Sequence, residues 1–248
     1  MRRFFVVREN ISGEQATITG PELDHMVKVM RLGPGDPVGL FDDQGWEHEG
    51  IFKSYDGRRA EVTILSSYRP ERESALQITL AQALGKGGKM DFIVEKAVEL
   101  GVSSIVPFVS EHTVPRLSSE KAIRRQARWQ KIALSASKQC GRTRVPEIHE
   151  LTSFADLVRS PATGDLRVVF WEGESSCGIG QLKAEKDQIA SLILAIGPEG
   201  GFSDQEIALA LRHGFRTVHL GKRILRTETA ALAALATTQL LWGDLGVR

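Results

Sequence analysis

Residues 192–206 read LILAIGPEGGFSDQE, and this stretch decides the fold. The apolar run Leu192–Ile196 predicts a buried strand, and a loop with three glycines and one proline follows it directly. Ser203 and Glu206 have the S-x-x-E spacing of a capping box, so a helix is expected from that point, and Gly214 is placed to end it. The stretch therefore predicts a strand, a tight loop and a helix in immediate succession.

The same alternation continues on both sides of this stretch. The other predicted strands are Gln77–Leu84, Ser104–Val109, Arg167–Trp171 and Thr217–Leu220. The predicted helices are Lys89–Leu100, Ser119–Gln139, Ser203–His213 and Thr229–Leu241. Strands that alternate with helices favour an α/β fold, with a mostly parallel sheet and helices on both faces.

The first 70 residues have a different pattern, in which short β-type runs are joined by turn signals such as Asp56-Gly57. One helical segment, residues 21–31, interrupts these runs. The pattern predicts a small β-barrel or meander. Because the polar stretch at residues 66–74 separates the two patterns, we predict one domain at residues 1–70 and a second at residues 75–248.

Composition narrows the class of protein. The chain has 248 residues, of which 42% are hydrophobic and 25% charged, and no apolar run approaches the roughly 20 residues that cross a bilayer. The N-terminus meets charge too early for a signal peptide, so we expect a cytoplasmic protein with no membrane partner. Cys140 and Cys177 form no C-x-x-C pair, and the histidines lack the i, i+4 spacing of a helical metal site, so no metal is expected.

The net charge of +1 conceals an uneven distribution. Residues 1–70 hold 9 Lys and Arg against 11 Asp and Glu, whereas nine basic residues and the single acid Glu120 lie between Arg116 and Arg144. Lys121, Arg124, Arg125 and Arg128 follow helical spacing and predict one positive helix face. Such a face is either ordinary solvated surface or a surface that contacts phosphates, and the rest of the chain favours the second interpretation.

Ligands of parallel sheets bind where strands end in loops. Three such loops are candidates: residues 196–202, 221–231 and 172–174. The glycines of the first let backbone approach a ligand closely. A tight connection with nothing bound would also explain that loop, and helix capping alone would explain Thr227 and Glu228. Residues 85–90 lack the spacing of a P-loop, residues 178–183 lack the third glycine of a dinucleotide fingerprint, and no G-x-S-x-G elbow is present.

Two motifs carry a family resemblance: IGPEGGFS at residues 196–203 and LGKRILRTETA at residues 220–230. Together they resemble the ribosomal RNA small subunit methyltransferase E family. The resemblance extends through RRFF at residues 2–5, residues 25–31, EKAVELGV at residues 95–102 and KQCGR at residues 138–142. Lys138 and Cys140 depart from the family pattern, which has an acidic residue and a serine there.

The resemblance implies methylation at N3 of one uridine in 16S rRNA, on the assembled small ribosomal subunit, with S-adenosylmethionine as the methyl donor. It also implies a SPOUT-type α/β knot, in which the C-terminal segment forms a trefoil knot, preceded by a PUA-like β-barrel that binds RNA. Two chains are expected to pair as a homodimer. DNA is not an expected partner.

The resemblance further implies a set of site residues. The donor is expected against Glu172, Ile196, Gly197, Pro198, Glu199, Gly200, Gly201, Leu220, Gly221, Ile224, Leu225, Arg226, Thr227 and Ala230. Because the uridine imide is protonated at neutral pH, Arg142 and Arg226 are candidates to stabilise developing charge, and Glu199 or Glu228 to act as the base or to orient it. The RNA is expected to contact Arg2, Arg3, His25, Lys28, Arg31, Arg124, Arg125, Arg128 and Arg142.

Two other functions compete with this one. A non-catalytic rRNA-binding ribosome assembly factor would keep the basic surface but would need neither residues 197–201 nor Arg226 and Glu228. An α/β enzyme acting on a small metabolite would not need the charge asymmetry at Arg116–Arg144. Donor binding and a salt-dependent affinity for RNA separate these alternatives from the methyltransferase.

Overall fold

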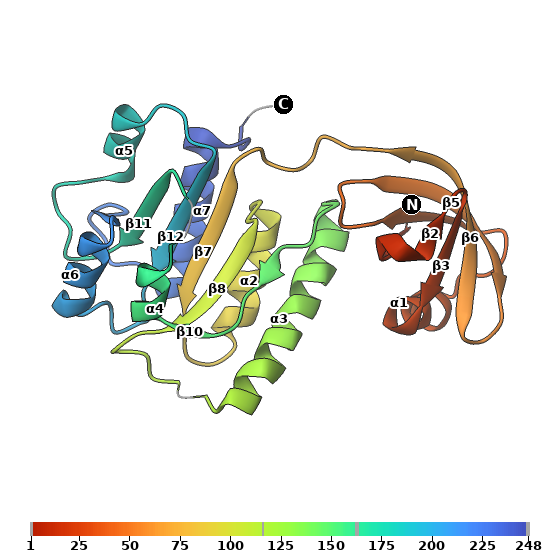
Figure 1. The fold of residues 1–248 in the computed structure, drawn as a ribbon, viewed down its shortest axis with the longest axis horizontal. Coiled ribbons are helices and arrows are strands. Elements are labelled where there is room, and N and C mark those ends of the chain that lie inside the picture. Colours follow the sequence, from red (N-terminus) through yellow and green to blue (C-terminus); the bar gives the residue numbers. More distant parts are fainter. Residues whose placement is uncertain (1, 116, 162–163, 247–248) are drawn as a thin grey trace. The chain divides into compact units, whose positions relative to one another are not determined.

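The structure is a computed structural model that describes residues 2–115, 117–161 and 164–246. The chain divides into two compact units (Figure 1). Unit 1 comprises Met1–Glu73 and Ser137–Val145, and unit 2 comprises Ser74–Ala136 and Pro146–Arg248. The segment Ser137–Val145, which the sequence pattern assigned to the second domain, thus groups with the first.

Unit 1 is built on a six-stranded sheet in the order β1-β4-β5-β6-β3-β2. The β1–β4 pairing is parallel and the other pairings are antiparallel. A short α-helix and a π-helix follow β3 where one helix was predicted. The strands are β1 (Arg2–Phe5), β2 (Ile11–Ser12), β3 (Gln15–Thr19), β4 (Pro37–Phe41), β5 (Glu47–Tyr55) and β6 (Arg59–Tyr68), and the helices are η1 (Arg8–Asn10), α1 (Gly20–Asp24) and η2 (His25–Val29).

Alternating side chains form the core of unit 1. Ala16 and Ile18 of β3 and Val62 and Ile64 of β6 point inward, as the period of two in a half-buried strand requires. A register shift follows Glu49 in β5, and at Gly50 an added Cβ would lie 2.5 Å from the Thr63 carbonyl oxygen. Only glycine allows β5 and β6 to approach this closely.

Arg3 and Glu73 bind the segment Ser137–Val145 within unit 1. The Arg3 guanidinium donates to the carbonyl oxygens of Ser137, Lys138 and Arg142 at 2.9–3.2 Å. Glu73 accepts hydrogen bonds from the backbone N–H groups that follow Arg142. These contacts satisfy backbone groups at the end of a helix, where intrahelical partners run out.

Unit 2 contains a parallel sheet in the order β10-β8-β7-β12-β11-β13, with β9 paired to β8. This confirms the predicted α/β architecture. The strands are β7 (Gln77–Ala83), β8 (Ser104–Val109), β9 (Glu147–Ile148), β10 (Thr152–Ser153), β11 (Leu166–Phe170), β12 (Ser191–Ile196) and β13 (Arg216–Val218). The helices are α2 (Lys89–Glu99), α3 (Ser119–Cys140), α4 (Phe154–Arg159), α5 (Ile179–Glu185), α6 (Asp204–Arg212) and α7 (Thr227–Trp242), and the part of α3 from Ser137 onward belongs to unit 1.

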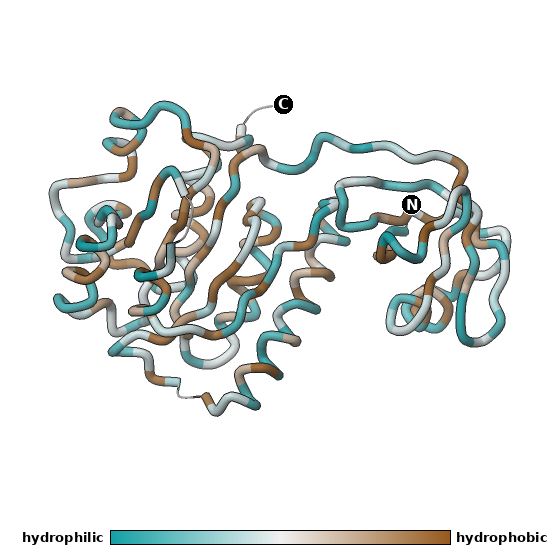
Figure 2. The backbone as a smooth tube through the Cα atoms, in the orientation of Figure 1, coloured by the Kyte–Doolittle hydropathy of each residue, from teal (hydrophilic) through white to brown (hydrophobic). Residues whose placement is uncertain are grey.

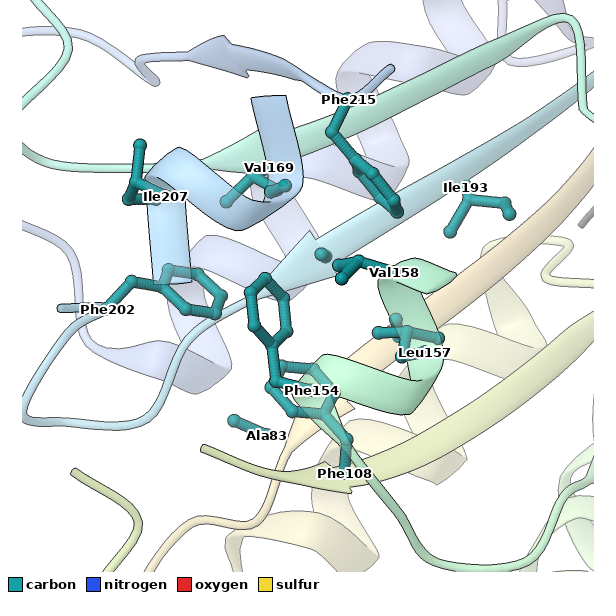
Figure 3. Packing of buried hydrophobic residues seen from close by; sticks show 13 residues of the cluster. Ala83, Phe108, Phe154, Leu157, Val158, Val169, Ile193, Phe202, Ile207 and Phe215 are labelled. Atoms are coloured by element: carbon teal, nitrogen blue, oxygen red, sulfur yellow. The ribbon is translucent and has the colours of Figure 1, made fainter. Parts of the chain in front are cut away.

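An apolar cluster fills the space between one face of this sheet and helices α4 and α6 (Figure 3). Phe202, at the end of the predicted glycine loop, packs on Phe154 with ring centroids 4.8 Å apart and stacks on Phe108 at 6.2 Å. The loop is therefore anchored to the core by its own aromatic residue. Helices α2 and α7 contact each other, and α7 also contacts β12.

Helix α3 is amphipathic, and hydrophilic and hydrophobic residues alternate along it (Figure 2). Trp129, Ala133 and Ala136 are buried, whereas Lys121, Arg124 and Lys131 are exposed. No helix among the described residues is long and apolar enough to cross a bilayer.

Candidate active site

The carboxyl ends of several strands bring the candidate loops of unit 2 together. Because β7, β8, β11 and β12 run parallel, the segments that follow them start at the same edge of the sheet. These segments are residues 84–88, 110–113, 171–174 and 197–202. Two of the three loops singled out in the sequence thus begin at this edge, and the third follows β13, which pairs with β11 in parallel.

A pocket of about 110 Å³ opens beside two of these loops. Its walls combine apolar side chains with a stretch of backbone, residues 220–226, that forms neither helix nor strand. The lining residues are Phe170, Trp171, Glu172, His219, Leu220, Gly221, Lys222, Arg223, Ile224, Leu225 and Ala230. Six of these were predicted from the sequence: Glu172, Leu220, Gly221, Ile224, Leu225 and Ala230.

The glycine loop lies close to this pocket through Glu172. Gly201 has a φ of +69°, and a Cβ added there would overlap the Glu172 carboxylate. A Cβ on Gly200 would lie 2.8 Å from His112, and one on Gly197 would lie 3.0 Å from Phe202. The loop therefore requires glycine at these positions, because it approaches Glu172, His112 and Phe202 closely. The residues of the loop are not among the pocket's described lining.

A buried hydrogen-bond chain joins the two motif segments. The Thr227 hydroxyl donates to the Gly197 carbonyl oxygen at 2.7 Å and accepts from the Gln82 amide at 2.9 Å. The sequence suggested that Thr227 caps the last helix, but Arg226 occupies the N-cap position and Thr227 is the first helical residue. The hydroxyl serves the glycine loop instead, because a buried donor needs an acceptor and the Gly197 carbonyl is within reach.

An ionic cluster lies beside this chain. The Lys89 ammonium is 2.8 Å from Glu199 Oε1 and 3.2 Å from Glu228 Oε2. Burial raises the pKa of Glu199, but hydrogen bonds from Lys89 and from backbone N–H groups outweigh it, so the pKa lies below its ordinary value. Hydrogen bonds to Glu199 raise the pKa of Lys89. Glu199 is therefore a stable carboxylate and a weak base, which favours an orienting role over proton abstraction.

The structure places the two candidate arginines in different units. Arg226 is exposed at the start of α7, next to the pocket residue Leu225. Arg142 is buried in unit 1, where its guanidinium binds Glu73 at 2.8–2.9 Å. Arg226 thus follows a pocket residue along the chain but is not among the described lining, whereas Arg142 has an ion-pair partner of its own.

The basic residues of unit 1 that were predicted to contact RNA differ in their exposure and in their partners within the protein. Arg3 is committed to Glu47 and to three carbonyl oxygens, which gives it a structural role within unit 1. Arg2 donates to the Met30 carbonyl, and Lys28 pairs with Asp24 at the surface. Arg31 is exposed with a positive φ of 54°.

Lys138, one of the two residues that differ from the expected motif, lies in a cluster with Glu22 and His25. The Lys138 ammonium lies 2.9–3.0 Å from both Glu22 oxygens and 3.3 Å from His25 Nδ1. The His25 ring also packs on Phe4. Lys138 is therefore neutralised within unit 1 by Glu22, a carboxylate from another part of the chain. Cys140 is an exposed free thiol.

Helix α3 retains only part of its predicted positive face. Arg124 pairs with Glu120 at 2.6 Å, and Arg128 pairs with Asp91, which also accepts from the Trp129 indole. Arg125 is half-buried, and Lys121 and Lys131 are exposed. Arg116 lies outside the described residues. Among the described side chains, no group of three His, Cys, Asp or Glu residues could hold a metal ion.

Comparison with known proteins identifies the class. A family model described as an RNA methyltransferase domain matches residues 72–239, and one described as an RNA methyltransferase PUA domain matches residues 18–65. The fold and these matches define an RNA methyltransferase with a PUA domain. More particularly, the chain belongs to the ribosomal RNA small subunit methyltransferase E family.

Relatives of that name match over nearly the whole chain. The one from Bacillus subtilis is 32% identical, over 98% of this chain and 100% of its own. The one from Mesomycoplasma hyopneumoniae is 34% identical, over 95% and 97%. A crystal structure of the Neisseria gonorrhoeae protein bound to S-adenosyl methionine is 36% identical and covers 98% of this chain and 99% of its own, with a TM-score of 0.87.

Sequence reasoning missed several residues at this site. Gln82 is the last but one residue of β7, and Lys89 begins α2 after it, next to a segment that lacks the spacing of a P-loop. The carboxyl-end rule, applied to β7 as it was to β12, would have found both. Phe170, Trp171 and His219 line the pocket only because β11 and β13 are neighbours in the sheet.

Proposed function

We propose that this protein uses S-adenosylmethionine to methylate N3 of one uridine in 16S rRNA, on the assembled small ribosomal subunit. The observation that carries the proposal is the Thr227–Gly197 hydrogen bond, which brings the two family motifs to one site beside the pocket. The family membership of the chain and the donor bound to the Neisseria gonorrhoeae relative support the choice of donor.

The residues at the pocket fit a nucleoside donor. Phe170, Trp171 and Leu225 supply apolar walls for a base, and the irregular backbone at residues 220–226 supplies polar groups for hydrogen bonds. Glu172, between the pocket and Gly201, adds a carboxylate that a hydroxyl or an ammonium can bind. The donor, when bound, supplies an electrophilic methyl group on a sulfonium.

The chain's own residues then have to align the acceptor and manage one proton. Alignment alone lowers the barrier strongly, because the methyl group needs no further activation. Arg226, exposed at the start of α7, is proposed to stabilise the negative charge that spreads over the uracil ring as N3 loses its proton. Glu228 is proposed as the base or its orienter, and Glu199 as a carboxylate that orients rather than abstracts.

The remaining features complete the proposal. Arg2, His25, Lys28, Arg31 and the exposed basic residues of α3 are proposed to contact rRNA phosphates. Unit 1 is proposed to close as a PUA-like β-barrel, and unit 2 to contain a trefoil knot. We further propose a homodimer that acts in the cytoplasm, where its ribosomal substrate is found, with Arg142 among the groups that bind RNA or stabilise charge.

Methyl transfer tests the proposal directly. Labelled S-adenosylmethionine is offered with small subunits that lack their own modification, with free 16S rRNA and with large subunits, and the product nucleosides are then analysed. We expect label in 3-methyluridine from small subunits alone. Label in another nucleoside would overturn the assigned atom. Binding to rRNA without any transfer at saturating donor would favour the assembly-factor alternative.

A further inference from the structure

Lys89 joins three segments of unit 2. It is the first residue of α2, and its ammonium reaches Glu199 of the glycine loop and Glu228 in the first turn of α7. The side chains of Lys89, Glu199 and Glu228 are 29%, 28% and 19% exposed. The cluster is therefore partly exposed at the candidate site, while the Glu228 oxygen that faces Lys89 is itself buried.

Backbone geometry holds Glu199 in this cluster. The Lys86 N–H donates to Glu199 Oε1 at 3.1 Å, the same oxygen that Lys89 binds. A Cβ on Gly85 would lie 3.4 Å from this oxygen, so the segment after β7 lies against the carboxylate. The segment between β7 and α2 is thus shaped to receive a side chain from the glycine loop.

The fold does not need the ionic cluster to connect these segments. Gln82, Thr227 and Gly197 already link β7, α7 and the glycine loop through buried hydrogen bonds. Phe202 anchors the same loop in the core. Partly exposed ion pairs add little to stability, because water screens the charges and ordering the side chains costs entropy. Stability therefore does not explain why Lys89, Glu199 and Glu228 form a second, ionic connection between the same segments.

We propose that Lys89 is a positioning residue for methyl transfer, which fixes the spacing between the glycine loop and the start of α7 by holding Glu199 and Glu228. This inference rests on the proposed function, because these two segments are the ones proposed to receive the donor. Without the ammonium, the carboxylates of Glu199 and Glu228 would repel each other, and these side chains would shift while the buried hydrogen bonds keep the two segments linked.

The chain offers a matched control on the same helix. Lys96 of α2 also lies between two carboxylates, Glu95 and Glu99, each at 2.8 Å, but at the opposite end of the helix from Lys89. Lys96→Met removes the same charge from the same kind of pair without touching the site. Lys89→Arg keeps the charge and is the conservative variant.

The experiment compares wild type, Lys89→Met, Lys89→Arg and Lys96→Met. Donor affinity is measured by calorimetry, kcat and KM by methyl transfer to small subunits, and folding by the thermal midpoint. We expect Lys89→Met to weaken donor binding and raise the donor KM by about tenfold or more, with a smaller change in kcat. Its midpoint should match that of Lys96→Met, and Lys89→Arg should recover most of the affinity.

The possible outcomes separate the role of Lys89 from the proposed function. If wild type binds and transfers methyl while Lys89→Met does so equally well, Lys89 is not a positioning residue and the proposed function stands. If Lys89→Met lowers the midpoint well beyond Lys96→Met, its role is structural and the inference is overturned. If wild type binds no donor, the proposed function fails and the inference fails with it. Adding Lys89→Met to Glu199→Gln should cost less affinity than Lys89→Met alone, since the pair is already broken.

Discussion

Gly201 combines a positive φ of +69° with close approach to Glu172. Gly201→Ala meets two penalties: the left-handed backbone costs roughly 1–2 kcal/mol, and the new methyl group displaces the carboxylate. We expect a lower free energy of unfolding and weaker donor binding, measured by denaturant titration and calorimetry.

Gly214 provides the control for this substitution. Its φ is +80°, and an added Cβ would meet nothing within 4 Å. Gly214→Ala carries only the backbone penalty, so it should lower the free energy of unfolding by less than Gly201→Ala and leave donor binding unchanged. Equal donor affinity in the two variants would show that the contact between Gly201 and Glu172 has no part in binding.

Glu174 shows how a carboxylate can hold a loop after a strand. It accepts hydrogen bonds from the Ser176 hydroxyl and N–H, the Thr217 hydroxyl and the Cys177 N–H. The Ser176 hydroxyl, followed by these other donors, lowers the pKa of Glu174 to about 2. A lowered pKa stabilises the fold above the ordinary value of 4.5, and this contribution is lost as pH falls towards 2.

Glu174→Gln should therefore reduce stability in a pH-dependent way. The difference in free energy of unfolding between wild type and Glu174→Gln is expected to be constant at neutral pH and to shrink below pH 4.5, as wild type becomes protonated. Denaturant titrations between pH 3 and pH 7 measure it. A difference that stays constant down to pH 3 would contradict the lowered pKa.

At the scale of elements, helix α6 shows how a local signal sets a boundary beside the site. The Ser203 hydroxyl accepts from the Glu206 N–H, and the Glu206 carboxylate accepts from the Ser203 N–H, which completes the predicted capping box. Glu206 also accepts from the Glu111 N–H, so the cap holds the loop after β8 as well. One local motif thereby fixes two of the segments at the carboxyl edge.

Ser203→Ala should cost about 1 kcal/mol in the free energy of unfolding, because one N-terminal N–H of the helix loses its acceptor. Denaturant titration measures the change, with Ser175→Ala, at an exposed serine, as the control. A loss equal to that of Ser175→Ala would mean that water replaces the cap at no cost.

Charge reversal tests the ion pair between Glu22 of α1 and Lys138 near the end of α3. Lys138→Glu places a carboxylate beside Glu22, and we expect a loss of roughly 1–2 kcal/mol in the free energy of unfolding, since both side chains are largely buried. The double variant Lys138→Glu with Glu22→Lys restores opposite charges and should recover much of it. If the double variant is no more stable than the single one, the ion pair does not account for lysine at this position.

For the whole molecule, affinity for rRNA should depend on salt through the exposed cations of α3. Replacing Lys121 and Lys131 with glutamine should reduce the slope of log affinity against log salt by roughly 0.7 for each phosphate that the protein no longer neutralises. Arg159→Gln with Arg212→Gln removes two exposed charges elsewhere in unit 2 and should leave the slope unchanged. Equal slopes for both double variants would mean that the exposed lysines of α3 do not contact phosphates and are ordinary solvated surface.

The glycine loop and the elements around it show which features could be predicted from the sequence alone. The strand Leu192–Ile196, the loop and the capped helix were all predicted, because each depends on neighbours within a few residues. The last helix was expected from Thr229, yet it begins at Thr227. The sequence could not place that start, because the hydroxyl of Thr227 is bound by Gly197 and Gln82, which lie far away along the chain.

The sequence by itself determined the α/β pattern of unit 2 and the family, because periodicity, caps and motif spacing are local properties of the chain. Only the tertiary structure decided that Lys89 joins Glu199 and Glu228, that Arg3 is a structural residue and that Lys138 is neutralised by Glu22. Each of these facts is a pairing between groups more than 25 residues apart, and strand order and packing determine which distant groups meet.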